Sequence, residues 1–399
     1  MKILQLCNKP PIPSVDGGCI AMKASAEAIL AGGNHLKVLA AETPKHPFIK
    51  FSANQHFVNL THFETVFIDT TVKPFKILLN LFSSKSYNVS RFWSPDFNNK
   101  LIQILQSEKY NIIQLESIYV APYIDTIRIF SSHSKIILRA HNVENELWFK
   151  QARNEKNLLK SLYYNLIARR LKKYEREVVH KVDAVAAISP KDAKRFSRFN
   201  ALAELKAIPL NIEINNNWNN SNNKITLFYI GSLDWKPNLE GLKWFLQSVW
   251  PEIYKQMPYL RFYIAGKKMP DKMKNRKIAG VIFEGEVKDA RAFMNSKKIM
   301  IVPLFSGSGV RVKILEAMSC GKTVISTSLG AEGLECEKNK NILIADNATE
   351  FIDDIKKCVN NPALCVETGL NALAFVKNNF STESIAARYS SLYEEVLKK

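Results

Sequence analysis

The stretch PLFSGSGVRVKILEAMSCGKTVISTSLGAEGLE, residues 303–335, gives the strongest indication of how this chain folds and what it binds. It begins within an apolar run, IMIVPLF, that predicts a buried strand, and it continues into VRVKILEAM, whose apolar spacing predicts a helix. The turn between them, SGSG, has very little side-chain bulk. A strand, a small-residue turn and a helix in this order are typical of a parallel α/β sheet with an anion site at the turn.

The helix expected after this turn has the features of a phosphate site. Backbone amides at a helix start have no partner inside the helix, and the helix dipole places positive charge there. Gly307 and Gly309, on either side of Ser308, would let a ligand approach the backbone, and Arg311 and Lys313 would add charge for a diphosphate. A phosphorylated small molecule fits this pattern better than a polynucleotide.

Glu316 lies about one turn further along the same expected helix, three residues after Lys313. The two side chains could form an i,i+3 ion pair, which would contribute roughly 0.2–0.5 kcal/mol. Alternatively, the Glu316 carboxylate accepts hydrogen bonds from the hydroxyls of a ribose, as acidic side chains do in dinucleotide sites. A diphosphate-binding turn followed by a carboxylate that binds ribose predicts a nucleotide site.

Two shorter nucleotide motifs do not fit this stretch. The sequence CGKT would complete a P-loop only if glycine stood where Glu316 does, and it lies between a helix and a strand instead of between a strand and a helix. The sequence GSGVRV lacks the last glycine of G-x-G-x-x-G. Neither an ATPase nor a standard NAD fold is therefore expected.

The chain of 399 residues is long enough for two domains. Alternating strand-like and helix-like runs predict an N-terminal Rossmann-like domain over 1–210 and a C-terminal one over 225–380. Between them, residues 211–224 (NIEINNNWNNSNNK) have no apolar period and predict a linker. Residues 381–399 predict a capped amphipathic helix that we expect to pack back on the first domain. Such an α/β fold should place its ligand in a cleft at the carboxyl ends of the strands.

The formal charge of +19 indicates an anionic partner, which could be nucleic acid, an anionic membrane or a phosphorylated ligand. There is no recognised nucleic-acid motif and no contiguous basic and aromatic stripe, so nucleic acid is the least favoured of the three. Residues 156–181 mix basic and apolar positions at helical spacing. They predict either a core helix with a solvated basic face or a peripheral contact with anionic lipid. No signal peptide or long apolar run is recognisable, and we expect a cytoplasmic protein.

The motifs together resemble the retaining glycosyltransferases of the GT-B group, specifically family four. The C-terminal signature of that family is a glycine turn, a helix carrying glutamate, then EAM, a small residue, glycine and a strand. It is matched by GVRVKILEAMSCGKTVIST. The resemblance extends in chain order through Gly17 and Gly18 in the first loop, RAHNVENE, AISPKDA, YIGSLDWKPNLEGLKWF and FEGEV. With a glycine turn before KILEA and a following GAEGL, the chain is similar to a branch that assembles bacterial surface polysaccharides.

The resemblance implies a GT-B fold, in which two Rossmann-like domains face each other across a cleft. It also implies transfer of a sugar, with retention of configuration, from a nucleotide-diphosphate sugar to a hydroxyl of a glycan or a lipid-linked acceptor. We expect no cofactor and no obligatory metal, because the chain contains no Asp-x-Asp and Arg311, Lys313 and helix amides would offset the charge of the leaving diphosphate. An epimerase or hydrolase of nucleotide sugars, or a basic nucleic-acid-binding protein, remains the alternative.

The resemblance also carries site residues over to this chain. Those expected to bind the donor are Gly17, Gly18, Ser232, Val287, Gly307, Ser308, Gly309, Arg311, Lys313 and Glu316. His141, at the end of a predicted strand, is expected to act with Arg311 and Lys313 in catalysis by orienting or polarising the donor. A structural histidine, or a metal pair with Glu144, would be the alternative. The sequence departs from the family pattern at Ser308, where the first glutamate of E-x7-E is usual, and at Ser232, where arginine is usual.

Overall fold

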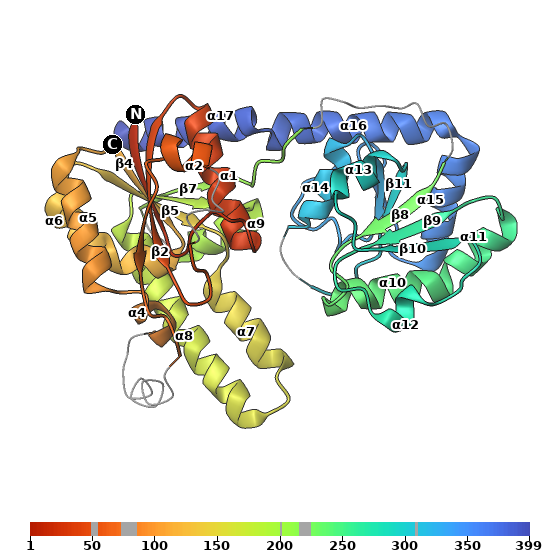
Figure 1. Cartoon of the computed structure of the whole chain (residues 1–399), viewed down its shortest axis with the longest axis horizontal. Helices are drawn as coiled ribbons and strands as arrows, with labels where there is room; N and C mark the ends of the chain where they lie inside the picture. Colours follow the sequence, from red (N-terminus) through yellow and green to blue (C-terminus); the bar gives the residue numbers. More distant parts are fainter. Residues whose placement is uncertain (49–54, 73–85, 200–201, 215–224, 308–309) are drawn as a thin grey trace. The chain divides into compact units, whose positions relative to one another are not determined.

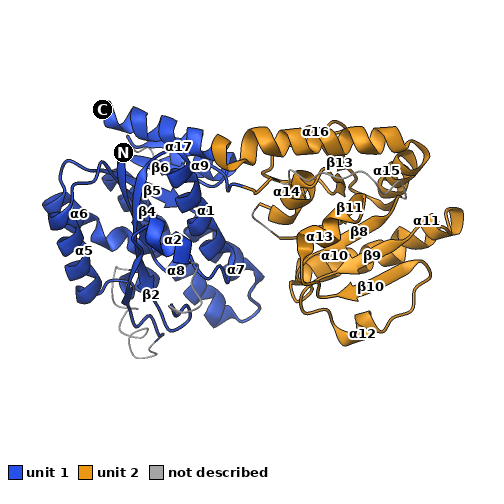
Figure 2. Cartoon of the chain, turned by 45° about the horizontal axis from the view of Figure 1, so that its top comes forward, with its two compact units in different colours: residues 1–211, 385–399 blue, residues 212–384 orange. Residues whose placement is uncertain are grey.

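The computed structural model describes residues 1–48, 55–72, 86–199, 202–214, 225–307 and 310–399 (Figure 1). They form two compact units, one of Met1–Asn211 with Ile385–Lys399 and one of Ile212–Ser384 (Figure 2). Most of the predicted asparagine-rich linker lies outside the described residues.

The first unit is built on a seven-stranded sheet in the order β3-β2-β1-β4-β5-β6-β7, in which all neighbouring strands are parallel. Its strands are β1 (Lys2–Cys7), β2 (His35–Glu42), β3 (Glu64–Phe67), β4 (Ile112–Glu116), β5 (Lys135–Ala140), β6 (Ala184–Ala187) and β7 (Glu204–Ala207). The central strands are almost entirely buried, which is why the sequence shows them as continuous apolar runs.

Helices cover both faces of this sheet (Figure 1). One buried cluster includes residues of α5, α6, α8 and α9, and a second includes residues of α1, α2 and the C-terminal helix α17. The helices are α1 (Gly17–Ala31), α2 (Gln55–Leu60), α4 (Tyr87–Ser90), α5 (Pro95–Ser107), α6 (Ile124–Phe130), α7 (Glu144–Asn154), α8 (Leu158–Lys181), α9 (Pro190–Phe196) and the 3₁₀ helices η2 (Ile118–Tyr123) and η3 (Ser197–Phe199).

The C-terminal helix α17 (Thr382–Leu397) is fixed to the first unit by its apolar stripe and by two tyrosines. The hydroxyls of Tyr389 and Ser25 lie 2.9 Å apart, and the hydroxyl of Tyr393 donates to Gln114 Oε1 at 2.8 Å. Both tyrosines are buried. The last residues of the chain thus complete the core of the domain in which the chain began.

The second unit has a six-stranded parallel sheet in the order β10-β9-β8-β11-β12-β13. Its strands are β8 (Leu227–Ile230), β9 (Phe262–Ala265), β10 (Val281–Gly285), β11 (Ile299–Val302), β12 (Thr323–Ser326) and β13 (Leu343–Ile344). Its helices are α10 (Lys236–Ser248), α11 (Trp250–Gln256), α12 (Asp271–Lys274), α13 (Ala290–Asn295), α14 (Val312–Ser319), α15 (Ala348–Asn360) and α16 (Pro362–Phe380).

Each sheet has one point where the order of strands reverses. In the first unit it lies between β1 and β4, and in the second between β8 and β11. The loops that leave such neighbouring strands diverge to opposite faces, so a crevice opens at the carboxyl ends of the strands, where ligands of open α/β sheets bind. The predicted fold class, α/β with two Rossmann-like parallel-sheet domains, is confirmed.

Candidate active site

The first cluster of site residues surrounds Lys313, in the first turn of α14. Its Nζ donates to Asn238 Oδ1 at 2.9 Å and lies 3.4 Å from the hydroxyl of Tyr229. Tyr229 lies in β8 and Asn238 in the helix α10 that follows, so groups from the β8 side of the switch point contact an ammonium carried by the helix that follows β11. Within the described residues, no carboxylate forms an ion pair with it.

The electrostatic state of Lys313 follows from these neutral partners. Burial, and then the neighbouring charge of Arg311, lowers the pKa of Lys313 to about 7. A bound anion would supply the missing opposite charge and raise that pKa again. The site is therefore suited to a ligand with negative charge at this position.

Arg311 directly precedes α14 and is 6% exposed. Its guanidinium lies 5.3 Å above the ring of Trp235, and burial lowers its pKa. Gly307 has a φ of +112°, and a Cβ there would lie 2.9 Å from the Trp235 ring and 3.0 Å from Arg311 Nη2. Both the backbone conformation and the space thus require glycine. The predicted ligands Ser308 and Gly309 lie outside the described residues.

Glu316 lies on α14 and is partly buried. Burial raises the pKa of its carboxyl, and Arg291 partly opposes that shift. In the part of the chain that the structure describes, its carboxylate has no hydrogen-bond partner and does not pair with Lys313. The alternative of an i,i+3 ion pair is not observed, and an unsatisfied carboxylate remains beside the cationic helix start.

Ser232 and Val287, the other two predicted donor residues of the second unit, follow β8 and β10. The Ser232 hydroxyl donates to Asp234 Oδ1 at 2.6 Å, and its carbonyl accepts from Asn238 Nδ2 at 2.8 Å. Val287 packs against the same buried cluster as Val310, next to Arg311. Both residues therefore belong to the carboxyl edge of the sheet that carries Lys313.

A second cluster lies in the first unit, at the ends of β4 and β5. His141 Nε2 lies 2.7 Å from Glu116 Oε2, and Glu116 Oε1 accepts from Gln5 Nε2 and Gln114 Nε2, each at 2.7 Å. Burial acts to raise the pKa of Glu116, but the hydrogen bond and charge of His141 and the charge of Arg139 lower it below its usual value. The carboxylate is therefore ionised, accepts hydrogen bonds only, and orients the imidazole.

Glu116 is a site residue that the sequence motifs did not predict. A carboxylate at the end of an otherwise apolar run, NIIQLE, was the available signal, because buried acids are rare without a partner. The second nitrogen of His141, Nδ1, is shielded and has no hydrogen-bond partner among the described residues. Shielded polar atoms without a partner cost free energy, which is consistent with a functional role for this imidazole.

The alternative of a metal pair between His141 and Glu144 does not match the contacts of these side chains. Glu144 Oε2 accepts from the hydroxyl of Tyr119 at 2.9 Å, while His141 faces Glu116. The backbone amide of Glu144 donates to Glu175 Oε1 at 2.7 Å, so Glu175, from α8, caps the start of α7. Glu144 thus belongs to a separate hydrogen-bond network.

Gly17 and Gly18 open α1, behind the cap residue Asp16. Asp16 accepts from Lys9 Nζ at 2.7 Å through both oxygens, and its Oδ2 lies 2.9 Å from His46 Nε2. Burial acts to raise the pKa of Asp16, yet these hydrogen bonds and that of the Cys19 amide hold it well below its usual range. The network ties the loop after β1 to the loop after β2.

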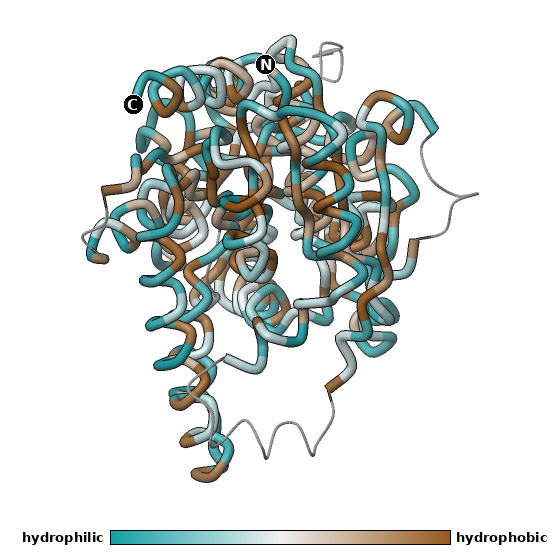
Figure 3. The backbone as a smooth tube through the Cα atoms, turned by 90° about the vertical axis from the view of Figure 1, so that its left-hand side faces the viewer, coloured by the Kyte–Doolittle hydropathy of each residue, from teal (hydrophilic) through white to brown (hydrophobic). Residues whose placement is uncertain are grey.

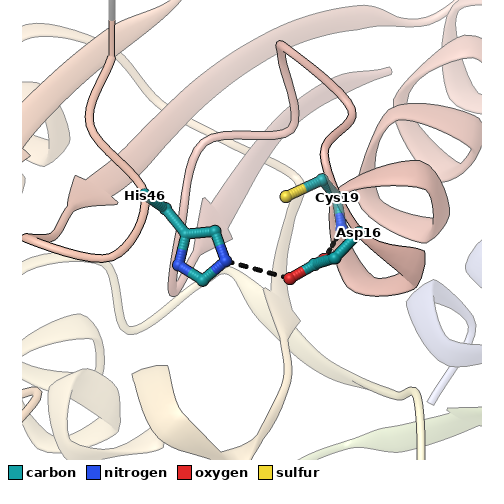
Figure 4. Close-up of side chains that lie close together, drawn as sticks. All are labelled: Asp16, Cys19 and His46. Atoms are coloured by element: carbon teal, nitrogen blue, oxygen red, sulfur yellow. Dashed lines mark hydrogen bonds and ion pairs between the residues drawn. The ribbon is translucent and has the colours of Figure 1, made fainter. Parts of the chain in front are cut away.

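The side chains of Asp16, Cys19 and His46 converge closely enough to hold a metal ion (Figure 4). No other group of this kind occurs among the residues that the structure describes. Lys9 occupies both oxygens of Asp16, however, and burial raises the pKa of the Cys19 thiol, so that a thiolate is disfavoured. The contacts fit a structural network better than a metal centre.

A pocket of about 460 Å³ lies beside this network, entirely within the first unit. Cationic or titratable groups on its wall come from three loops and are Lys9, Lys45, His46 and Arg91. Tyr119 also lines it, and the same tyrosine donates to Glu144, three residues after His141. The pocket is suited to a polar ligand that carries negative charge.

Comparisons with known proteins agree with this architecture. Residues 224–361 match the model of the family Glycosyl transferases group 1. An uncharacterised 44.6 kDa protein in the cps region of Klebsiella pneumoniae is 26% identical over 307 residues, which span 74% of this chain and 77% of that protein. An uncharacterised glycosyltransferase of Methanocaldococcus jannaschii is 30% identical over 122 residues, 30% of this chain and 31% of that protein.

The fold also matches solved structures over its full length. Anabaena HepE in complex with UDP has a TM-score of 0.63 at 15% identity, with 99% of this chain and all of that one covered. This likeness establishes the two-domain GT-B fold. Residues 224–361 of the second unit thus match the Glycosyl transferases group 1 family, and the chain is a glycosyltransferase of the GT-B fold. The predicted fold and enzyme class are confirmed.

Proposed function

We propose that this glycosyltransferase transfers a sugar from a nucleotide-diphosphate sugar to an acceptor hydroxyl with retention of anomeric configuration. The observation that carries the donor assignment is Lys313, at the start of α14. Its pKa is lowered to about 7, and its partners among the described residues are neutral oxygens. A diphosphate would supply the charge that this site lacks. HepE was solved with UDP, so uridine diphosphate sugars are the first donors to test.

In the proposed reaction, Arg311, Lys313 and the first amides of α14 stabilise the negative charge that develops on the leaving diphosphate. Glu316 accepts hydrogen bonds from the ribose. His141, oriented by Glu116, holds or polarises the donor sugar beside the reacting carbon. The acceptor hydroxyl forms the new glycosidic bond as the old one breaks, and its proton leaves with the diphosphate. Because these groups supply the charge, no metal ion is required.

We propose that the acceptor binds in the pocket of the first unit and carries an anionic group. The cations Lys45 and Arg91 on the pocket wall support this choice, since they would neutralise a phosphate, whereas Lys9 is already paired with Asp16. The cps region of the Klebsiella relative favours a surface-polysaccharide intermediate. A glycan on a diphosphate lipid carrier has the anionic group and is a surface-polysaccharide intermediate. Such an acceptor would require contact with a membrane surface. Within the described residues, no helix is long and apolar enough to span a bilayer, so the proposed contact is peripheral.

Product analysis tests this proposal. The enzyme is incubated with nucleotide sugars, with and without EDTA, and with lipid-diphosphate acceptors, and the products are followed by NMR. We expect release of the nucleoside diphosphate only when an acceptor is present, an unchanged anomeric configuration in the product, and no effect of EDTA. An isomerised donor, or free sugar formed without acceptor, would instead identify an epimerase or a hydrolase.

A further inference from the structure

The helices α7 and α8 form a hairpin that extends beyond the core of the first unit (Figure 1). The buried residues of α8 begin only at Ala168, and none of residues 158–167 is buried. Ile167 packs against the core, so at a rise of about 1.5 Å per residue the nine residues before it extend roughly 14 Å past the core. Contacts between the helices, such as the Trp148–Tyr164 ring pair and the bond from Ser161 Oγ to the Ala152 carbonyl, hold the hairpin together.

The end of this hairpin includes apolar residues, drawn as brown segments among hydrophilic ones in Figure 3. Leu158 and Leu159 are each 79% exposed, and Leu162 is 66% exposed. Leu158 and Leu159 open α8 and Leu162 follows about one turn later, and the three side chains together form what we call the leucine tip. Single exposed leucines are common on protein surfaces, whereas three adjacent ones on a projecting turn require a partner.

Positive charge predominates in the residues next to the leucine tip in the chain. Residues 150–162 contain four cations, Lys150, Arg153, Lys156 and Lys160, and a single carboxylate, Glu155. Of these cations, Arg153, Lys156 and Lys160 form no ion pair with any residue that the structure describes. Exposed apolar side chains among an excess of basic ones are the pattern of a segment that inserts into the headgroup region of an anionic bilayer.

We propose that the leucine tip docks this enzyme on an anionic lipid bilayer. Leu158, Leu159 and Leu162 enter the boundary between headgroups and acyl chains, and the surrounding lysines and arginine bind lipid phosphates. Lipid is favoured over a protein partner because the three leucines lie at the end of a projecting hairpin and the charges near them in the chain are predominantly positive. The benefit of docking rests on the proposed lipid-linked acceptor, but the docking itself does not depend on it.

Sedimentation of the full-length enzyme with vesicles tests the proposal. The vesicles contain phosphatidylcholine alone or phosphatidylcholine mixed with phosphatidylglycerol. We expect binding to the anionic vesicles, weakened by salt, and at least about a tenfold lower partition for the combined variant L158S/L159S/L162S. The variant K156Q/K160Q should lose the preference for anionic lipid. Ile129→Ser removes an equally exposed apolar side chain, 74% accessible, from α6 and should bind as the wild type does.

Two results would overturn the proposal. The triple variant could bind anionic vesicles as strongly as the wild type does, or the wild type could bind no vesicles while sedimentation velocity shows a dimer that the triple variant cannot form. In the second case a second copy of the chain covers the tip. Thermal shifts with nucleotide sugars are measured on every variant. A lost nucleotide response in the wild type would contradict the donor proposal and leave the vesicle result unaffected.

Discussion

The Nζ atom of Lys313 lies 2.9 Å from Oδ1 of Asn238, so the ammonium at the start of α14 is held by a neutral amide that lies 75 residues earlier in the chain. No carboxylate among the residues that the structure describes pairs with it, and burial, followed by the charge of Arg311, lowers the pKa of Lys313 to about 7. The free enzyme therefore contains a cation that is only partly protonated near neutral pH, in the place where the donor diphosphate is proposed to bind.

This relationship predicts a pH dependence of donor binding. A nucleotide sugar requires Lys313 in its protonated form, and the protonated fraction of Lys313 falls as pH rises through its pKa. The diphosphate diester of the ligand does not titrate in this range. The affinity of the enzyme for the nucleotide sugar, measured by calorimetry, should fall by about tenfold between pH 7 and pH 8.5. Lys313→Arg keeps its charge and should bind more weakly at pH 7 but with a nearly flat profile. A flat profile in the wild type would contradict the assignment.

The contact between Glu116 and His141 predicts that substitutions of these residues change kcat more than the KM for the donor. His141→Ala should lower kcat by about 10²–10³-fold with little change in the KM for the donor, since the imidazole is proposed to act on the reacting sugar. Glu116→Gln keeps the shape but loses the charge that orients the ring, and it should lower kcat by a smaller factor. Steady-state kinetics and melting curves measure both effects.

A matched carboxylate provides the control for this pair. Glu108 of the same unit accepts from Lys2 Nζ at 2.6 Å on the surface, and Glu108→Gln should leave kcat unchanged. A fully active His141→Ala, or a Glu116→Gln that changes only the KM, would remove both residues from the proposed reaction.

Gly241 predicts a stability effect in the second unit. A Cβ at this position in α10 would lie 1.6 Å from the carbonyl oxygen of Pro303, at the beginning of the site loop. Gly241→Ala should therefore force α10 away from β11, lower the free energy of unfolding by about 1–3 kcal/mol and weaken nucleotide binding. At Gly17 an added Cβ meets nothing within 4 Å, so Gly17→Ala should melt as the wild type does. If Gly241→Ala and Gly17→Ala had the same melting temperature, that result would be inconsistent with this packing.

Glu175 predicts that the stability of the first unit depends on pH. Burial raises its pKa to about 7, although it accepts hydrogen bonds from the Glu144 and Asn145 amides. A folded-state pKa above the unfolded value of 4.5 means that stability is greatest below about pH 4.5 and is lost as pH rises through 7. From pH 5 to pH 8 the wild type should lose up to roughly 3 kcal/mol relative to Glu175→Gln. Urea unfolding at the two pH values measures this difference, and an equal pH response of the two proteins would exclude it.

Much of the fold was predictable from local patterns, whereas the partners of the site residues were not. The strand, glycine turn and helix from Ile299 to Ser319 were visible because strand and helix periods are local properties of the sequence. The place of His141 at the end of β5 followed for the same reason. The contacts Lys313–Asn238 and His141–Glu116 depend on which strands become neighbours, and a single sequence does not encode that pairing in any local pattern.

Calorimetric titration of nucleoside diphosphates tests the central claim, that the start of α14 binds the diphosphate of the donor, most directly. The wild type should bind one nucleoside diphosphate in the presence of EDTA. Lys313→Ala and Glu316→Ala should each weaken that binding by at least about tenfold, because they remove the diphosphate and ribose contacts. Glu240→Ala, which changes an exposed carboxylate of the same unit, should have no effect. If no nucleotide binds a cooperatively folded wild type, or if both site variants bind as tightly as it does, this assignment is wrong.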